Sequence, residues 1–389
     1  MSLPSPRRIQ GPRVVVVGAG IVGLCCALEI ARRGGNVVVV DADAAPASLD
    51  SPPRAASFAA AGMLGAFSEA LHEGPGHHRR LSELCADGLK AWRALAASDP
   101  ELTELVRFDG ALLLAHDEAD AARVKRAADR AKRNGARFDL HDGLPSDLDA
   151  RVYGAKVKLS ARIHDEGVAA TRPTLARLGE IALSYGASIL RGRSVTEVTS
   201  SGGKVRGVSF DDGGNLPADV VILATGALAS EALQRTAPSL ARIAPAKGMI
   251  GVAIPPAAFD LAETVRTPRL YFWREEERLL FGATSELGRS DLDPDPDMLA
   301  ALYLEVRRTL PGARFEGGAS VHAVGLRPMS PDGAPIVGFD GPEGCIVAAG
   351  HGRNGWLLGP TTGAAIAALA RGEAVAPVWR GFGPDRFAS

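Results

Sequence analysis

The sequence predicts an α/β protein with two domains: a discontinuous domain built on a parallel sheet, and an inserted α+β domain built on an antiparallel sheet. Residues 13–17 and 37–40 are continuous apolar runs on either side of a helical pattern at residues 20–33, which is the order of a βαβ unit. Apolar runs that lead into glycine-rich turns recur at residues 219–223 and 345–349. The parallel sheet should therefore collect strands from the start, middle and end of the 389-residue chain.

A different pattern lies between these runs. Residues 249–254 and 278–283 alternate as antiparallel strands do, and residues 298–310 have the spacing of a helix packed on them. A chain of this length is too long for one ordinary domain. We therefore expect the first domain to comprise residues 1–95, 150–240 and 320–389, and the inserted domain to comprise residues 96–149 and 241–319.

Composition excludes several classes of function. The formal net charge of −1 provides no field to attract nucleic acid or an anionic membrane surface. No run of about 18 uncharged apolar residues is present that would span a bilayer. Residues 1–13 contain no apolar block of the kind found in secretory signal peptides, so we interpret them as a loose tail of a cytoplasmic protein.

The cysteines and histidines give no sign of a metal site. No cysteine pair forms a CxxC motif or stands at zinc-ligand spacing with a histidine, which indicates reduced structural thiols. The four cysteines are Cys25, Cys26, Cys85 and Cys345. His72, His77 and His78 cluster in a polar segment without acidic residues at ligand spacing, so a solvated loop is the expected interpretation.

A glycine-rich turn after the first strand predicts a bound dinucleotide. Gly18, Gly20 and Gly23 form G-x-G-x-x-G at the start of the helix, where glycines permit a tight turn, close approach of a pyrophosphate and close helix packing. Asp41 ends the second strand 23 positions after Gly18, where a carboxylate accepts hydrogen bonds from a ribose. The alternative is a glycine-rich turn with a solvated aspartate. NAD and FAD share this Rossmann-like pattern, so the turn leaves the choice between them open.

Three other motifs carry a resemblance to a known family. They are residues 59–66 (AAAGMLGA), 325–333 (GLRPMSPDG) and 348–355 (AAGHGRNG), and Ala224-Thr225-Gly226 follows a buried strand between them. Together they resemble the glycine oxidase and D-amino acid oxidase branch of FAD-dependent oxidoreductases over nearly the whole chain. The resemblance implies a non-covalent FAD. Some relatives attach flavin through a cysteine near the second motif, but residues 325–329 contain none and Cys345 should fill the core.

The resemblance assigns cofactor contacts by position. The adenosine and pyrophosphate would contact Gly18, Gly20, Ile21, Val22, Gly23, Asp41 and Ala42, and the adenine end would contact Val195. The isoalloxazine would lie along Ala61, Gly62 and Met63, and the chain would return beside the cofactor at Thr225 and Gly226. The flavin ring would be surrounded by His351, Gly352, Arg353, Asn354, Gly355, Trp356 and Leu357.

The same resemblance assigns the substrate side of the site. Arg327 matches the arginine that binds the substrate carboxylate, a role suited to a planar, permanently charged donor; the alternative is an interdomain salt bridge. Arg353 would be a second arginine in the pocket, or else part of a salt bridge. The family's substrate tyrosine aligns with Leu270, and Tyr271 beside it should point to the opposite face of the strand. Whether Tyr271 replaces that tyrosine stays open.

Two departures bear on the substrate. Ser285 stands where glycine oxidases tend to have methionine, and Gly352 and Trp356 are more similar to the pattern of D-amino acid dehydrogenases. Glycine itself is therefore in question as the substrate.

The resemblance implies oxidation of a small amino acid or amine of the glycine, sarcosine or D-amino acid class. A hydride would pass to flavin N5, giving an imine or keto acid and, with oxygen, hydrogen peroxide; a glycine-derived imine would serve thiamine biosynthesis. One alternative is a D-amino acid dehydrogenase that passes electrons to a quinone or carrier. Others are a non-catalytic flavin-binding module and an NAD-dependent dehydrogenase. A homo-oligomer is left open.

Overall fold

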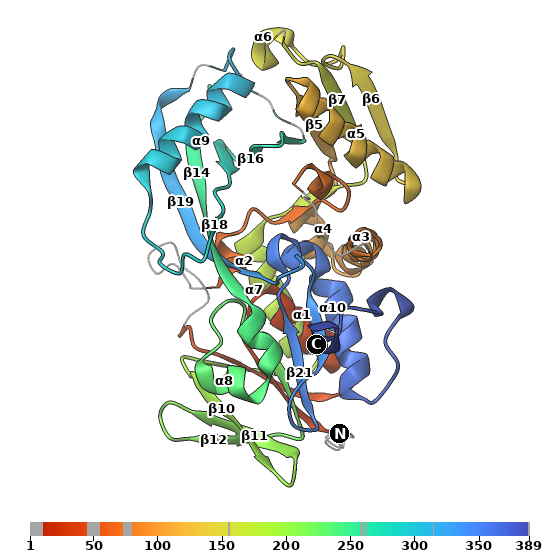
Figure 1. The fold of residues 1–389 in the computed structure, drawn as a ribbon, viewed down its shortest axis with the longest axis vertical. Helices are drawn as coiled ribbons and strands as arrows, with labels where there is room; N and C mark the ends of the chain where they lie inside the picture. Colours follow the sequence, from red (N-terminus) through yellow and green to blue (C-terminus); the bar gives the residue numbers. More distant parts are fainter. Residues whose placement is uncertain are drawn as a thin grey trace, which may run out of the picture.

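The computed structural model describes residues 11–44, 55–72, 80–154, 156–256, 259, 261, 263–313 and 315–387. The first ten residues of the predicted tail, and His77 and His78 of the predicted histidine loop, lie outside these residues. A mainly parallel sheet with α1 and α10 forms the lower part of the molecule in Figure 1, and a mainly antiparallel sheet with α9 and α5 forms the upper part. The predicted α/β fold class is confirmed.

The six-stranded sheet collects strands from the whole chain. Its order is β20 (Ile336–Phe339), β21 (Cys345–Ala349), β13 (Val220–Leu223), β1 (Arg13–Val17), β2 (Asn36–Asp41) and β9 (Ser188–Arg191). Every neighbouring pair is parallel except β20 with β21. Four consecutive valines, Val14–Val17, are all buried, which explains why this strand has a continuous apolar sequence rather than an alternating one.

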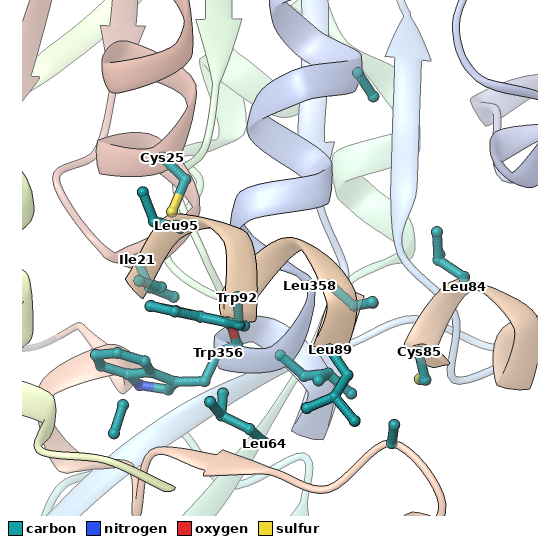
Figure 2. Close-up of a cluster of buried hydrophobic side chains, with 14 of the residues drawn as sticks. Ile21, Cys25, Leu64, Leu84, Cys85, Leu89, Trp92, Leu95, Trp356 and Leu358 are labelled. Atoms are coloured by element: carbon teal, nitrogen blue, oxygen red, sulfur yellow. The ribbon is translucent and has the colours of Figure 1, made fainter. Parts of the chain in front are cut away.

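Small residues bring the helices of this sheet together. α1 (Ile21–Arg32) packs against α10 (Gly355–Ala370) and α7 (Thr171–Ser184), and α10 also contacts α3 (Leu81–Ala97). A Cβ atom at Gly363 would lie 2.5 Å from the carbonyl oxygen of Cys25, so only glycine permits this approach of α10 to α1. Figure 2 shows Trp92 of α3 beside Trp356 of α10; their rings stack with centroids 6.0 Å apart.

The nine-stranded sheet forms the second part of the molecule. Its order is β18 (Glu286–Leu287), β14 (Ala244–Ile254), β17 (Arg278–Gly282), β16 (Tyr271–Glu275), β15 (Thr264–Arg266), β5 (Ala111–Ala115), β7 (Leu159–Ile163) and β6 (Phe138–Asp142), with β19 (Glu316–Met329) paired to β14. Its pairs are antiparallel as predicted, except that β15 and β5 are parallel. α9 (Pro296–Thr309) and α5 (Glu118–Arg133) cover it.

Two strands of this sheet lie outside the segments predicted for the inserted domain. β7 falls within residues 150–240 and β19 extends beyond residue 320, yet β7 pairs with β5 and β6, and β19 pairs with β14 along most of its length. Residues 316–329 contain three glycines and lack a clean alternation, which explains why the sequence did not identify them as a strand. The division into domains stays a prediction, but the residues at which the chain passes from one sheet to the other differ from the predicted domain boundaries.

Short elements complete the fold. They are α2 (Ala56–Ala59), η1 (Ser68–Leu71), α4 (Pro100–Leu105), α6 (Ala150–Tyr153) and α8 (Glu231–Thr236), the hairpin sheet of β10 (Val195–Ser201), β11 (Lys204–Phe210) and β12 (Asn215–Pro217), and a small sheet of β3 (Met63–Leu64), β8 (Gly167–Ala169) and β4 (Val106–Arg107). Within the described ranges, no helix combines the length and apolarity that crossing a bilayer requires.

We predict that Gly363→Ala destabilises the protein. The new Cβ meets backbone atoms of Cys25, and overpacking of this kind costs about 1–3 kcal/mol, more than the about 1 kcal/mol that alanine gains in a helix. Urea unfolding of the purified protein, followed by circular dichroism, measures the change. Gly318→Ala is the control because nothing lies within 4 Å of its Cβ position. Equal unfolding midpoints for the two variants would contradict the tight contact between α1 and α10.

Candidate active site

A cavity of about 710 Å³ lies between the two sheets. One end lies at the start of α1 and at β10, and the other reaches residues of β14, β16 and β19. Most of the predicted site residues line it: Gly18, Gly20, Ile21, Val22, Asp41, Ala42, Ala61, Gly62, Met63, Val195, Thr225, Gly226, Tyr271, Arg327, His351, Gly352, Arg353, Gly355 and Trp356. The structure thus brings together segments that are separated by more than three hundred positions in the sequence.

Close backbone contacts build the first end of the cavity. Gly18 has φ of 107°, and a Cβ atom there would lie 2.5 Å from the carbonyl oxygen of Ala224, at the end of β13. A Cβ atom at Gly23 would lie 1.9 Å from the carbonyl oxygen of Gly18. Gly23 does not line the cavity; its role is the close packing that the third glycine of the motif provides.

The start of α1 is held by two side chains. The Asp41 carboxylate accepts hydrogen bonds from the backbone N–H of Ala19 at 2.5 Å and of Asp43 at 2.9 Å. The hydroxyl of Ser57 accepts a hydrogen bond from the N–H of Ile21 at 3.0 Å. Because the N-terminus of a helix carries partial positive charge and unpaired N–H groups, this end of the cavity suits a pyrophosphate.

A buried polar atom without a partner supports the presence of a ligand here. The Oγ1 atom of Thr225 is shielded from solvent and has no hydrogen-bond partner among the described residues, yet Thr225 lines the cavity beside Gly226. Buried hydroxyl groups are normally paired, so an unpaired one on a cavity wall fits a bound polar group. A dinucleotide laid along α1 would supply that group. The residues at this end therefore fit the cofactor that the sequence predicts.

The opposite end has walls of small and aromatic residues. Ala61, Gly62 and Met63 form one wall, and the turn from His351 into α10 forms another. The His351 imidazole lies 3.0 Å from the hydroxyl of Thr362, and burial lowers its pKa to about 3, so the ring is neutral. The indole N–H of Trp356 donates to the carbonyl oxygen of Ser57 at 3.0 Å, which fixes the ring at the cavity wall. A planar, largely apolar group fits between these walls.

Arg327 presents a guanidinium group to this end of the cavity. It comes from β19, and its Nη1 donates to the carbonyl oxygen of Thr284 at 2.9 Å. No carboxylate of a described residue lies within ion-pair distance, so the interdomain salt bridge considered from the sequence has no described partner. Burial and the nearby Arg353 lower the pKa of Arg327 from its usual value. A partly buried cation that has no counterion among the described residues makes a site for an anion.

Tyr271, and not Leu270, faces the cavity. Leu270 is buried in the apolar cluster of the nine-stranded sheet, whereas Tyr271 lines the cavity and its phenol lies near Arg327. Successive side chains of a strand point to opposite faces, which accounts for the difference. Arg327 and Tyr271 therefore lie side by side on the wall that the antiparallel sheet provides.

Arg353 lies on the cavity wall and is also part of an ion pair. Its Nε donates to Glu69 at 3.0 Å, and the other carboxylate oxygen of Glu69 accepts a hydrogen bond from Arg266. The two guanidinium groups hold the pKa of Glu69 well below its usual range although burial opposes this. Glu69 was not predicted as a site residue; its isolation among the small and apolar residues 55–71 is the signal that it needs a cationic partner.

Two other predicted cofactor contacts do not reach the cavity. Asn354 is buried and its Oδ1 has no hydrogen-bond partner in the described part of the chain, and Leu357 packs in the core of the six-stranded sheet. Ser57 was not predicted because its role depends on a contact with Ile21, 36 positions away. The predicted segments therefore meet at the cavity, and Gly23, Asn354 and Leu357 are the predicted residues that do not line it.

The four cysteines, and His72 of the predicted histidine loop, lie in buried or partly buried surroundings. All four cysteines are buried and unbonded, and Cys345 packs in an apolar cluster, where burial raises its pKa to about 12. His72 was expected in a solvated loop, but it lies close to Arg353 and Glu69 and burial lowers its pKa to about 3. Among the residues that the structure describes, no group of histidine, cysteine and carboxylate side chains could hold a metal ion.

Comparison with known proteins agrees with this geometry. Residues 13–369 match the family model described as FAD dependent oxidoreductase. Glycine oxidase of Geobacillus kaustophilus is 29% identical over 367 residues, 92% of each chain, and its crystal structure covers 96% of this chain and 98% of its own with a TM-score of 0.81 at 26% identity. D-amino acid dehydrogenase of Rhizorhabdus wittichii is 25% identical, covering 93% of this chain and 96% of its own.

A third relative is longer. The bifunctional protein ThiO/ThiG of a Synechocystis strain is 28% identical over 384 residues, which covers 96% of this chain and 54% of its own. The chain therefore spans about half the length of that protein.

We predict that Thr225→Val weakens binding of FAD without unfolding the protein. Loss of one hydrogen bond to the cofactor costs about 0.5–1.5 kcal/mol, or about 2- to 12-fold in Kd. Titration of the apoprotein with FAD, followed by the loss of flavin fluorescence, measures the affinity. Thr236→Val is the matched control because its hydroxyl donates within α8 to the carbonyl of Ala232 and does not line the cavity. Equal affinities for the two variants would show that Thr225 does not contact the cofactor.

Proposed function

Because the chain belongs to the family of FAD-dependent oxidoreductases, with glycine oxidases among its relatives, we propose that it oxidises a small amino acid or amine that carries a carboxylate. The observation that carries the proposal is Arg327, a partly buried guanidinium at the ring end of the cavity that has no counterion among the described residues. The substrates in view are glycine, N-methylated glycine and small D-amino acids.

The chain's own residues position the substrate in this proposal. Arg327 binds the carboxylate, and the Tyr271 phenol beside it adds a hydrogen bond and restricts the orientation of the carboxylate. Residues 61–63 and 351–356 would hold the flavin ring. Bound FAD would supply the acceptor for a hydride from the α-carbon, and water would hydrolyse the resulting imine to a 2-oxo acid and the free amine, which is ammonia or, from an N-methylated substrate, methylamine.

No side chain is required as a general base in this scheme. The amine reacts in its neutral form, so the site has to favour loss of the ammonium proton before the hydride leaves. The positive charge of Arg327, which has no counterion among the described residues, favours the amino acid as an anion with a neutral amine over the zwitterion with an ammonium group. The apolar walls at residues 61–63 keep water away from the reacting carbon.

An anaerobic screen tests the proposal. The purified yellow protein is mixed without oxygen with glycine, sarcosine, small D-amino acids and, as a comparison, the matching amines without a carboxylate. We expect the carboxylate-bearing amines to bleach the flavin absorbance and the others to leave it unchanged. Bleaching by none of them would contradict the proposal and favour a flavin-binding module without turnover.

The similarity to a D-amino acid dehydrogenase makes the electron acceptor a second question. We propose oxygen, with hydrogen peroxide as the product, and a quinone or protein carrier as the competing candidate. Mixing substrate-reduced protein with air-saturated buffer in a stopped-flow instrument separates them. Reoxidation within the turnover time supports the oxidase, and slow reoxidation supports the dehydrogenase.

We predict that Arg327→Ala keeps FAD but loses affinity for the amino acid. Removing one partner of a buried, charged hydrogen-bonded pair costs about 2–5 kcal/mol, which is at least about 30-fold in Kd. The Kd comes from the dependence of anaerobic flavin reduction on substrate concentration. Arg278→Ala is the control, since Arg278 pairs with Glu275 outside the cavity. An unchanged Kd in Arg327→Ala would exclude Arg327 as the carboxylate site.

A further inference from the structure

A carboxylate lies on the same cavity wall as the two arginines. Glu69 lines the cavity, and its side chain is 12% exposed. One of its oxygens pairs with Arg353 and the other with Arg266, so both are engaged by guanidinium groups. Arg266 itself does not line the cavity and is 1% exposed. Glu69 therefore lies between a guanidinium behind the wall and one on the wall.

The position of Glu69 is fixed by a buried framework. Arg266 also donates to the hydroxyl of Ser68, and the carboxylate of Glu166 accepts from the backbone N–H groups of Phe67 at 2.5 Å and Ser68 at 2.8 Å. A Cβ atom at Gly65 would lie 2.0 Å from Arg266 Nη1, so the absence of a side chain there makes room for the guanidinium. The segment that carries Glu69 is thus held from two sides, and its carboxylate cannot easily turn away from Arg353.

The charges on the wall leave one positive charge, which a single carboxylate would balance. At this end of the cavity the lining residues with charge are Arg327, Arg353 and Glu69, which leaves an excess of one positive charge. Arg353 is neutralised by Glu69 at 3.0 Å, whereas Arg327 has no described counterion. An unmatched charge that is partly removed from solvent is costly, so the site favours an anion of charge −1.

We propose that Glu69 restricts the site to amines with a single carboxylate, by keeping Arg353 neutralised and by repelling a second anionic group. The inference rests on the proposed function, because it requires a carboxylate at Arg327. An amine with two carboxylates, such as iminodiacetate, would bring its second carboxylate toward Arg353 and therefore toward Glu69. Specificity of this kind comes from a repulsive element rather than from an additional attraction.

The substitution Glu69→Gln tests the inference, because it keeps the shape of the side chain and removes its charge. The probes are the unreactive ligands acetate and malonate, which carry one and two carboxylates, and binding to the FAD-loaded protein is followed by isothermal titration calorimetry. We expect the wild-type protein to prefer acetate. In Glu69→Gln the Kd for malonate should fall at least about tenfold, a change that corresponds to about 1.4 kcal/mol in binding free energy. The Kd for acetate should change less than about threefold.

Two further variants separate selectivity from general damage. Glu263→Gln removes the same charge from another partly buried ion pair, with Arg162, that does not line the cavity, and it should leave both affinities unchanged. Arg353→Gln leaves Glu69 without its partner on the wall, so both ligands should bind more weakly and malonate should lose more. Because Arg353 is 27% exposed, this variant tests the inference even if Glu69→Gln does not fold.

The outcomes distinguish this inference from the proposed function. Tighter malonate binding in Glu69→Gln, together with the larger loss of malonate in Arg353→Gln, supports a charge filter at Glu69. Equal changes for both ligands in these variants, or unchanged malonate affinity in Glu69→Gln, overturn the filter alone. If acetate does not bind the wild-type protein, the carboxylate site at Arg327 is wrong and the filter is overturned with it.

Discussion

The close approach of backbone segments at the start of α1 is the constraint on which the rest of the structure depends. Gly18 lies against the carbonyl of Ala224, and Gly23 lies against the carbonyl of Gly18, so β1, β13 and α1 meet without side chains between them. This leaves the first turn of α1 open to the cavity. Ser57 then accepts a hydrogen bond from Ile21, which ties the segment after residue 55 to the same turn.

That segment connects the two sheets. It continues through Met63 on the cavity wall to Ser68 and Glu69, which accept hydrogen bonds from Arg266 on β15 of the antiparallel sheet. Breaking a buried ion pair by removing one partner typically costs about 3–5 kcal/mol. The charged network therefore holds the antiparallel sheet, with Arg327 and Tyr271, at a fixed place relative to the parallel sheet.

The sequence predicted the elements whose signals are local. Strand β1 was predicted because a parallel strand buried on both faces is a continuous apolar run, and the turn at Gly18 because only glycine fits such backbone contacts. Strand β19 was not recognised because its three glycines weaken the alternation. Its pairing with β14 depends on residues about 70 positions away, which no local pattern reveals.

The candidate site was predicted by segment more accurately than by residue. Trp356 and Leu357 are neighbours in sequence, but one helical step of about 100° separates their side chains, so Trp356 lines the cavity and Leu357 enters the core. Glu69 was missed because its importance comes from Arg266 and Arg353, which are distant in sequence. Long-range charge pairing is the information that the sequence alone does not display.

The two walls of the cavity differ in how they can change over evolutionary time. The wall along α1 includes Gly18 and Gly20, which present only main-chain atoms, and a point substitution cannot replace those; it can only obstruct them by adding a side chain to a glycine. The wall from the antiparallel sheet presents side chains such as Arg327 and Tyr271, each of which a single codon change can exchange. Proteins that descend from one ancestor with this fold can thus acquire different amine substrates while they keep the same cofactor.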